Sequence, residues 1–159
     1  MSIYDVAIIG AGPAGMASAI TLAKQGLQIV IFDENPQLGG QIYRNVTNCP
    51  IDSKKILGTD YTYGHTLVQQ IYNLDNITHY TSTTVWNIQS QGNTTHIYTT
   101  QANHPHTLVC TARKVILSNG AIERPMPING WTKAGVMTVG GLQALLKTSG
   151  VVEIGRAHV

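Results

Sequence analysis

Residues 4–15 of the chain are YDVAIIGAGPAG, and they indicate the architecture of the domain that they open. The first half is a short, largely apolar run ending in glycine, which is typical of a buried parallel strand. The second half, residues 10–15, has the spacing G-x-G-x-x-G, and Pro13 suits the first turn of a following helix. A second apolar run, residues 27–32, ends at Asp33. A strand, a helix and a strand within about 30 residues predict a parallel sheet.

Each glycine of this loop has a separate physical role if the loop holds a dinucleotide. Gly10 permits the tight turn out of the strand, Gly12 lets a pyrophosphate approach the backbone, and Gly15 lets the helix pack close to the sheet. The helix N-terminus presents unpaired N–H groups and a partial positive charge to the phosphates. Asp33 is placed to accept hydrogen bonds from a ribose 2′-hydroxyl, and its carboxylate would repel a 2′-phosphate. The pattern therefore predicts a dinucleotide site that disfavours NADP.

The rest of the chain predicts further helices and a β-rich insert. Residues 45–60 show little periodicity and are expected to be loop, whereas residues 64–74 are expected to form a helix. Residues 77–109 carry Thr, Tyr, Val and Ile in short runs broken by turn residues, a texture typical of antiparallel hairpins. An apolar strand is expected at residues 114–117 and a helix at about residues 139–147. The predicted fold class is α/β, a Rossmann-like parallel sheet with an antiparallel β insert.

The sequence after the second predicted strand, DENPQLGGQ at residues 33–41, resembles the flavoproteins that have two dinucleotide-binding domains. In that family the glycine fingerprint opens the chain, and a Gly-Gly pair, here Gly39-Gly40, passes close to the FAD. The resemblance therefore implies FAD as the cofactor and disfavours an ordinary NAD-binding module. It also implies that residues 1–152 are the N-terminal portion of an FAD/NAD(P)-binding domain.

Three further site positions follow from the same resemblance. The family commonly uses backbone groups of its β-rich insert to hold the adenine, so Val85 is the candidate here. Residues 118–120, SNG, stand where the family has Ala-Thr-Gly, and this departure weakens a contact carried over to Asn119. Arg44 is either a cofactor contact or a surface cation. The residues expected to bind FAD are Gly10, Gly12, Pro13, Ala14, Gly15, Asp33, Glu34, Gly39, Gly40, Gln41, Arg44, Val85, Asn119 and Gly120.

A narrower resemblance lies in residues 39–44, GGQIYR, and in residues 120–125, 130–132 and 135–138. These segments resemble the flavin-bearing subunits of opine oxidases, D-hydroxyproline dehydrogenases and bacterial hydrogen cyanide synthase. Those α-type subunits oxidise an amine or amino acid together with a partner subunit. The resemblance implies flavin hydride transfer, an amine or amino-acid substrate and a second flavoprotein subunit. A pyridine-nucleotide-dependent flavin reductase and a non-catalytic flavin-binding electron-relay module remain alternatives, and no catalytic side chain can be assigned.

Composition bounds the other possibilities. Charged residues make up 11% of the chain and the net charge is +2, which favours neither nucleic acid nor an anionic membrane. No apolar run approaches the roughly 20 residues that span a bilayer, and the N-terminus lacks a secretory pattern, so a cytoplasmic location is expected. Cys49 and Cys110 have neither metal-binding nor disulfide-reductase spacing, and no metal site is expected. Glu123 is expected to form only a local ion pair with Arg124.

The C-terminal residues 153–159, EIGRAHV, look like the translation of a widely used sequencing-adapter oligonucleotide, and a non-native tail is expected there. Members of the resembled family return to the FAD domain after an inserted second domain. The resemblance therefore implies an FAD domain that is incomplete at its C-terminus. We expect the 159-residue chain to bind FAD weakly and to have no turnover.

Overall fold

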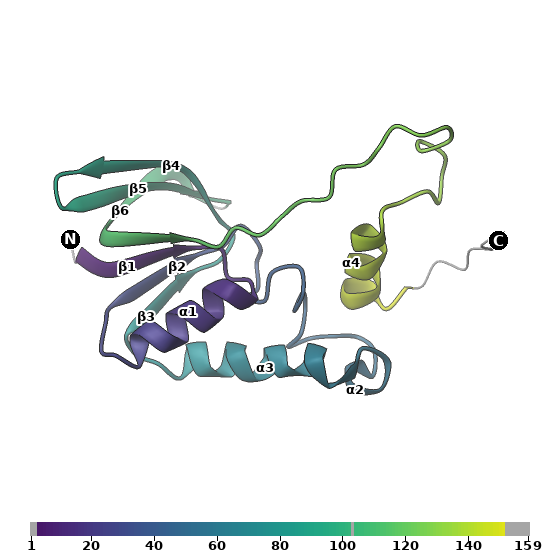
Figure 1. Ribbon diagram of the computed structural model, residues 1–159, viewed down its shortest axis with the longest axis horizontal. Coiled ribbons are helices and arrows are strands. Elements are labelled where there is room, and N and C mark those ends of the chain that lie inside the picture. The colour runs from purple at the N-terminus through teal and green to yellow at the C-terminus, as the bar shows by residue number, and fades with distance from the viewer. Residues whose placement is uncertain (1–2, 103, 152–159) are drawn as a thin grey trace.

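The apolar run at the start of the chain forms strand β1 (Ile3–Ile9), which lies inside a six-stranded sheet in the computed structural model (Figure 1). The structure describes residues 3–102 and 104–151. The order of the strands in the sheet is β3-β2-β1-β6-β5-β4. The remaining elements are α1 (Pro13–Ala23), β2 (Ile29–Phe32), α2 (Ser53–Ile56), α3 (Gly58–Tyr72), β3 (Ile77–Tyr80), β4 (Thr83–Gln91), β5 (Thr94–Gln101), β6 (His104–Leu117) and α4 (Val139–Ser149).

Strands β3, β2, β1 and the second half of β6 run parallel. Val6 lies opposite Ile29, and Ile9 lies opposite both Phe32 and Leu117. Helix α1 connects β1 to β2 and α3 precedes β3, so both helices pack side by side on one face of the sheet (Figure 1). The carboxyl ends of the parallel strands therefore meet at one edge, together with the loops that follow β1, β2 and β6.

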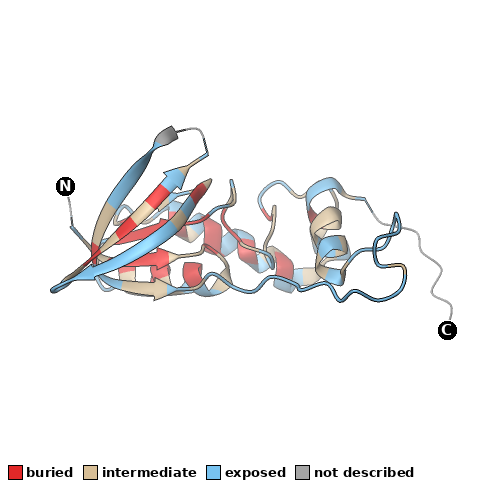
Figure 2. Cartoon of the chain, turned by 90° about the horizontal axis from the view of Figure 1, so that it is seen from above, coloured by how far each residue is buried: buried red, intermediate tan, exposed pale blue. Residues whose placement is uncertain are grey.

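The parallel strands bury apolar side chains on both faces, which fits their nearly continuous hydrophobic sequence (Figure 2). One cluster fills the space between the sheet and the helices, and includes Ile8, Met16, Ile29, Ile31 and Ile71. The other lies between the opposite face and the insert, and includes Ala7, Val30, Phe32, Ile97 and Ala112. Each large side chain buried in this way contributes about 1.5–3 kcal/mol, so the strands and the insert form one packed unit.

Strand β3 corrects the prediction that all of residues 77–109 form antiparallel hairpins. It pairs parallel with β2, with Ile77 opposite Ile29 and Tyr80 opposite Phe32. The Thr- and Tyr-rich texture indicates strand but does not distinguish the direction of pairing. The direction follows from helix α3, because a helical crossover returns the chain parallel to the strand that it left.

The insert itself is antiparallel, as predicted, and consists of β4, β5 and the first half of β6. A turn at Gly92, with φ +59°, joins β4 to β5. The separate strand expected at residues 114–117 is the end of β6, which continues without interruption for 14 residues. One edge of β6 pairs with β5 and the other with β1, so Ala112 has a partner in both. This strand joins the insert to the parallel sheet.

The expected loop at residues 45–60 is partly helical, and this prediction was wrong. Helix α2 forms within it, with the Asp52 side chain accepting a hydrogen bond from the backbone N–H of Lys55. Helix α3 begins earlier than the predicted residue 64, and it buries Leu67, Val68 and Ile71 on one face. The apolar face was predictable, whereas the first turns lack the periodicity that would have revealed them.

Beyond β6, an extended arm formed by residues 121–138 leads to α4, which stands apart from the sheet (Figure 1). Glu123 does not form the expected ion pair with Arg124. Its carboxylate accepts a hydrogen bond from the backbone N–H of Gly140 at 3.0 Å, in the first turn of α4. Hydrogen bonds from Thr138 and Gly140 keep the pKa of Glu123 below its ordinary value. The acidic group therefore caps a helix, where the positive end of the dipole favours it.

None of the helices in the described ranges, 3–102 and 104–151, has the length and apolarity required to cross a membrane. The expected adapter-derived tail, residues 153–159, lies outside the described residues.

Candidate functional site

The loop between β1 and α1 has backbone geometry that requires its glycines. Gly10 has φ +102°, and a Cβ atom there would lie only 2.8 Å from the carbonyl carbon of Ser118. A Cβ atom on Gly15 would lie 2.7 Å from the Ser118 hydroxyl oxygen. Gly12 is the N-cap of α1, and within the described residues no side chain caps this helix. Its first-turn N–H groups, at Pro13-Ala14-Gly15 apart from the proline, are thus left to a ligand.

The predicted Gly39-Gly40 pair lies against this loop. The backbone N–H of Gly39 donates a hydrogen bond to the carbonyl of Ala11 at 2.9 Å. Gly40 has φ +60°, and a Cβ atom there would lie 2.7 Å from the Cα atom of Gly12. Two backbone segments without side chains therefore approach each other at the N-terminus of α1. A Cβ atom at either position would occupy space that a diphosphate needs.

The carboxylate of Asp33 is 7% exposed and anchors this loop from the end of β2. Its Oδ2 accepts a hydrogen bond from the backbone N–H of Ala11 at 2.6 Å. Its Oδ1 accepts two from Asn35, from the backbone N–H at 2.8 Å and from Nδ2 at 2.9 Å. A carboxylate has about four lone-pair sites, so about one is left for a ribose hydroxyl. Asp33 thus fits the predicted contact and also fixes the glycine loop.

The insert is attached to the same edge of the sheet. The backbone N–H of Thr83 donates to the carbonyl of Asp33 at 2.8 Å, and that of Ser82 donates to the carbonyl of Asn35 at 2.9 Å. These bonds fix the start of β4 beside the end of β2. Val85 follows on β4, where it is half-buried and pairs with Thr99. Its backbone is therefore held in the neighbourhood that the adenine contact requires.

The loop after β6 completes this edge. The Ser118 hydroxyl donates hydrogen bonds to the carbonyls of Ile9 at 3.0 Å and Gly10 at 2.9 Å. A Cβ atom on Gly10 would lie 3.1 Å from the Cα atom of Asn119, so this residue borders the glycine loop. Asn119 and Gly120 are both exposed. The serine that departs from the family pattern therefore ties β6 to the loop and leaves Asn119 at the surface.

Arg44 is half-buried and tied to the loop that follows Gly40. Its Nη2 donates to Oε1 of Gln41 at 3.0 Å and to Oδ1 of Asn35 at 3.5 Å. These contacts resolve the alternative of a free surface cation, because two amide oxygens hold the guanidinium beside the loop. Glu34 and Ala14, in contrast, are exposed.

Sequence reasoning missed three residues that organise this edge of the sheet. Asn35 was detectable from the Asp-x-Asn spacing, because an aspartate commonly accepts a hydrogen bond from the backbone two residues later. Ser118 had a weaker signal, a hydroxyl directly after an apolar strand. Lys147 had none, because its partners lie more than 100 residues away in sequence.

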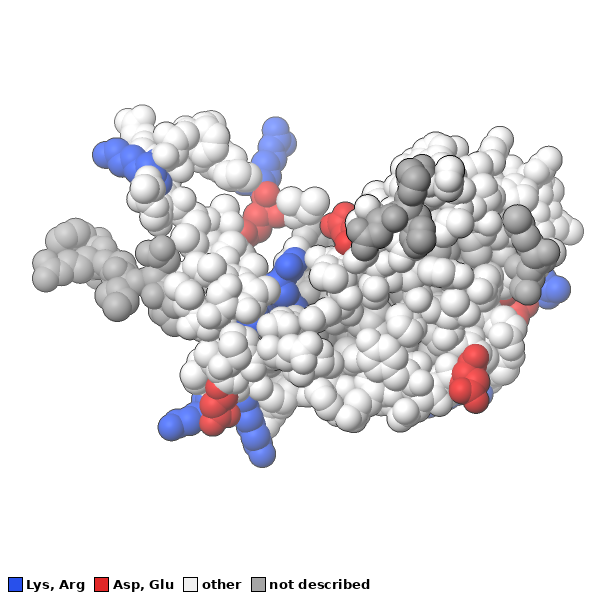
Figure 3. All heavy atoms as spheres, turned by 180° about the vertical axis from the view of Figure 1, so that it is seen from behind, with Lys and Arg blue, Asp and Glu red and all other residues white. Residues whose placement is uncertain are grey.

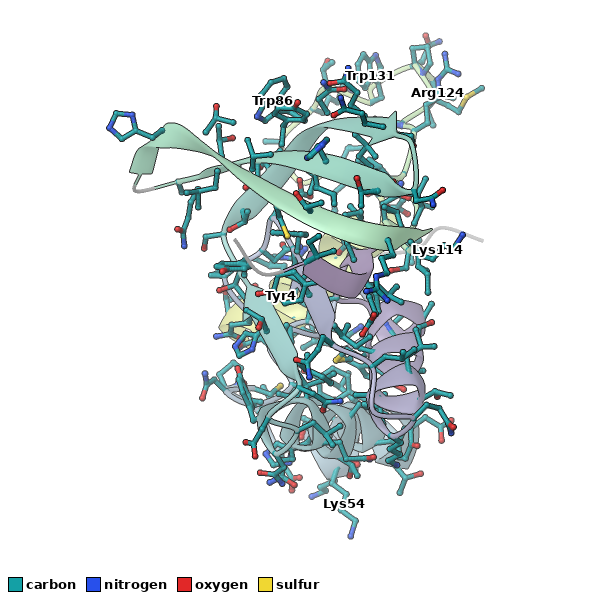
Figure 4. The ribbon with its side chains drawn as sticks, turned by 90° about the vertical axis from the view of Figure 1, so that its left-hand side faces the viewer. Tyr4, Lys54, Trp86, Lys114, Arg124 and Trp131 are labelled. Atoms are coloured by element: carbon teal, nitrogen blue, oxygen red, sulfur yellow. The ribbon has the colours of Figure 1, made fainter. Side chains whose placement is uncertain are left out.

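A separate cleft of about 240 Å³ lies on the face of the sheet away from the helices, between the parallel strands and the insert. Tyr4 lines it in the angle between these two sets of strands, together with Tyr80 and Cys110 (Figure 4). Burial raises the pKa of the Cys110 thiol to about 11, so this group is protonated at neutral pH. Cys49 packs against the other apolar cluster, on the helix side of the sheet. Residues 3–102 and 104–151 contain no cluster of three metal-ligating side chains.

These features together define a Rossmann-like dinucleotide-binding domain with an antiparallel insert. The family model for pyridine nucleotide-disulphide oxidoreductases matches residues 4–155, and the chain belongs to this family. Its cofactor is FAD, and the family is one of FAD-dependent oxidoreductases, as predicted.

Two curated relatives are similar to nearly the whole chain. The first-named subunit of opine oxidase from Agrobacterium tumefaciens is 40% identical, over 96% of this chain and 31% of that protein. Hydrogen cyanide synthase subunit HcnB from Pseudomonas aeruginosa is 33% identical, over 92% of this chain and 30% of that protein. The chain thus spans about a third of the length of these relatives.

Among solved structures, the fold is similar to L-proline dehydrogenase from P. horikoshii. The TM-score is 0.76 at 24% identity, over 95% of this chain and 29% of that one. This likeness supports the predicted Rossmann-like fold class, including the antiparallel insert.

Proposed function

We propose that the chain supplies FAD-binding elements to an oxidoreductase that oxidises an amine or amino acid, and that this enzyme works with a second flavoprotein subunit. The observation that carries the proposal is the close approach of Gly40 to Gly12 beside the buried carboxylate of Asp33. The relatives support the substrate class, because the most similar one named above is an opine oxidase subunit. Their names as subunits support the partner.

The residues divide the cofactor between them. The N-terminus of α1 and the backbones of Gly12 and Gly40 would hold the diphosphate, and Asp33 would hold the adenosine ribose. The backbone of Val85 would hold the adenine. When bound, FAD supplies a ring system that accepts a hydride, so the contribution of this chain is to bind and orient it. The remaining predicted contacts, from Pro13, Ala14, Gly15, Glu34, Gly39, Gln41, Arg44, Asn119 and Gly120, border this path.

A pyridine-nucleotide-dependent flavin reductase is the second candidate, and the family name favours it. The two candidates differ in what reduces the flavin. An amine or amino acid would reduce it in the first case, and NADH or NADPH in the second. In a third case, an electron-relay module, neither would reduce it without a partner subunit.

Flavin titration tests the shared part of these candidates. We expect the purified chain to quench FAD fluorescence more strongly than that of FMN, which lacks the adenosine that Asp33 and Val85 would hold. Gly40→Ala should weaken FAD binding about tenfold or more, because its Cβ atom would meet Gly12. Gly92→Ala is the matched control, since Gly92 has a similar φ of +59° but nothing within 4 Å of its added Cβ. Equal effects of the two substitutions would contradict the proposed site.

Anaerobic bleaching of the flavin absorbance separates the candidates. Opines and amino acids should bleach the FAD-loaded enzyme if it oxidises amines, whereas bleaching by NADH alone would favour the reductase. We further propose that residues 1–152 form one portion of the FAD domain and that the enzyme is cytoplasmic. Weak FAD binding by the 159-residue chain also remains a prediction.

A further inference from the structure

The described residues bury two charged side chains, and these lie on either side of the glycine segments. One is Asp33 and the other is Lys147 of α4, each 7% exposed. The Nζ atom of Lys147 donates hydrogen bonds to the carbonyls of Ile42 at 2.9 Å and Gln41 at 3.3 Å. It also lies 5.5 Å from the centre of the Tyr61 ring. Helix α4 therefore inserts a cation directly behind the loop that follows Gly40.

A chain of hydrogen bonds connects Lys147 to Asp33 through both glycine segments. The peptide group between Ile42 and Tyr43 accepts from Lys147 through its carbonyl and donates through its N–H to the carbonyl of Gly39 at 3.1 Å. The N–H of Gly39 donates to the carbonyl of Ala11. The N–H of Ala11 donates in turn to the carboxylate of Asp33. Hydrogen bonds in series polarise one another, so the charges at the two ends strengthen the bonds between them.

The charge of Lys147 has no carboxylate partner. Over residues 3–102 and 104–151, the ion pair within 4.0 Å joins Arg113 to Asp5, away from this loop. Arg44 adds a second positive charge on the same loop. Figure 3 shows basic side-chain atoms in the hollow between the sheet-bearing part of the molecule and the part that carries α4. A buried cation without an opposite charge is costly, and a bound dianion would offset that cost.

We propose that Lys147 is a positioning residue for the FAD diphosphate. Its ammonium group fixes the carbonyls of Gln41 and Ile42, which keeps Gly40 against Gly12, and its charge favours a diphosphate over a neutral ligand. This inference rests on the proposed function, because it assumes that the glycine segments hold FAD. It assigns a role in that site to α4, which lies about 130 residues after the fingerprint in sequence.

Substitution of Lys147 with Met and with Arg tests the inference. Lys147→Met keeps the apolar stem that is packed beside Tyr61 and removes the charge, so we expect FAD affinity to fall about tenfold. Lys147→Arg keeps the charge and should retain affinity within about threefold. Lys133→Met, on the exposed arm, is the control and should change nothing. A purely structural role of the stem would make Lys147→Met harmless, and that result would overturn the inference.

The pH dependence of FAD binding gives a second readout. Burial and the neighbouring Arg44 lower the pKa of Lys147 from 10.5, so its charge is present at neutral pH and is lost as the pH rises through the lowered pKa. FAD affinity should therefore fall at alkaline pH in the wild type but not in Lys147→Met. The other groups that face the ammonium are Cys49 and Tyr61. The pKa of Tyr61 is raised by burial, so it stays protonated, and a Cys49→Ser background removes the thiol.

Hydrogen exchange separates this inference from the proposed function. In the chain without FAD, Lys147→Met should speed exchange of the Tyr43 and Gly39 amides, because the hydrogen-bond chain loses its charged end. A wild type that ignores FAD would defeat the proposed function and this inference with it. If the wild type binds FAD, a flat alkaline profile or unchanged exchange in Lys147→Met would overturn the inference alone. Should Lys147→Met not fold, the wild-type profile and the Lys147→Arg affinity still decide it.

Discussion

The edge of the sheet that carries the glycine segments and the arm formed by residues 121–138 are built in opposite ways. At the sheet edge, backbone groups of Gly10, Ala11 and Gly39 are all engaged, and the buried carboxylate of Asp33 accepts hydrogen bonds on both oxygens. Along the arm, large apolar side chains face outward, and Ile122 is 90% exposed (Figure 2). The sheet edge therefore fixes its own conformation, whereas the apolar side chains of the arm stabilise nothing within the described residues.

This difference explains where substitutions should matter. A side chain added at the sheet edge meets backbone that cannot move without breaking hydrogen bonds to β2 or β6. A side chain changed on the arm meets mainly water. The effect of a substitution should thus decrease from the glycine loop, through Asp33 and the start of α4, to the middle of the arm.

The largest effect is expected from Gly10→Ala. Gly10 has φ +102°, and the new Cβ atom would lie 2.8 Å from the carbonyl carbon of Ser118. Backbone strain and overpacking add, so the free energy of unfolding should fall by about 3 kcal/mol or more. Urea denaturation followed by circular dichroism measures this loss.

Gly26→Ala is the control for that measurement. Gly26 also has a left-handed backbone, with φ +81°, but an added Cβ atom has no neighbour within 4 Å. Only the backbone strain remains, and the loss should be about 1 kcal/mol. If both substitutions cost the same, the close contact between the glycine loop and Ser118 is not present in solution.

The next effect in size is expected from Asp33→Asn. The amide would direct N–H donors at the N–H groups of Ala11 or Asn35, which now donate to the carboxylate. The loss of a buried charged acceptor costs about 1.5–3 kcal/mol of unfolding free energy, and FAD affinity should fall about tenfold or more. Asp75→Asn, at an exposed carboxylate after α3, should change stability by less than about 0.5 kcal/mol. A stable Asp33→Asn variant with wild-type FAD affinity would contradict this account.

Much of the sheet edge could be predicted because its signals are local. The strand, the glycine loop and Asp33 lie within about 30 residues, and each glycine is required by its own backbone geometry. The left-handed Gly39 and Gly40 belong to the same local pattern. The contacts from Ser118 and Lys147 could not be predicted in the same way, because they join residues more than 100 positions apart.

The errors in the predicted fold have a common physical cause. Strand propensity at residues 77–80 and 104–117 shows that the backbone is extended but not which neighbour it pairs with. Pairing is decided by the crossover through α3 and by the length of β6, both of which are tertiary features. The cap on α4 was missed for a similar reason, since Glu123 lies outside the usual N-cap spacing of Thr138 and Gly141.

A smaller and local effect is expected from Glu123→Gln, where the arm meets α4. The folded pKa of Glu123 lies below its ordinary value of 4.5, so the stabilisation that it gives α4 is complete above that pH and is lost as the pH falls through the folded pKa. Amide exchange at Gly140 should accelerate over that acidic range in the wild type. In Glu123→Gln it should be faster at neutral pH and independent of pH between 4.5 and about 7, after correction for the intrinsic exchange rate. Identical protection in both proteins would show that the cap is not formed.

The smallest effect is expected in the middle of the arm. Ile122→Ser removes an apolar side chain that is already in water, so the free energy of unfolding should change by less than about 0.5 kcal/mol. Ile8→Ala, in the core between the sheet and the helices, should cost about 2–5 kcal/mol in the same urea titration. A loss above about 1 kcal/mol for Ile122→Ser would mean that the arm packs against the protein in solution. The contrast between the two regions would then be one of sequence alone and not of burial.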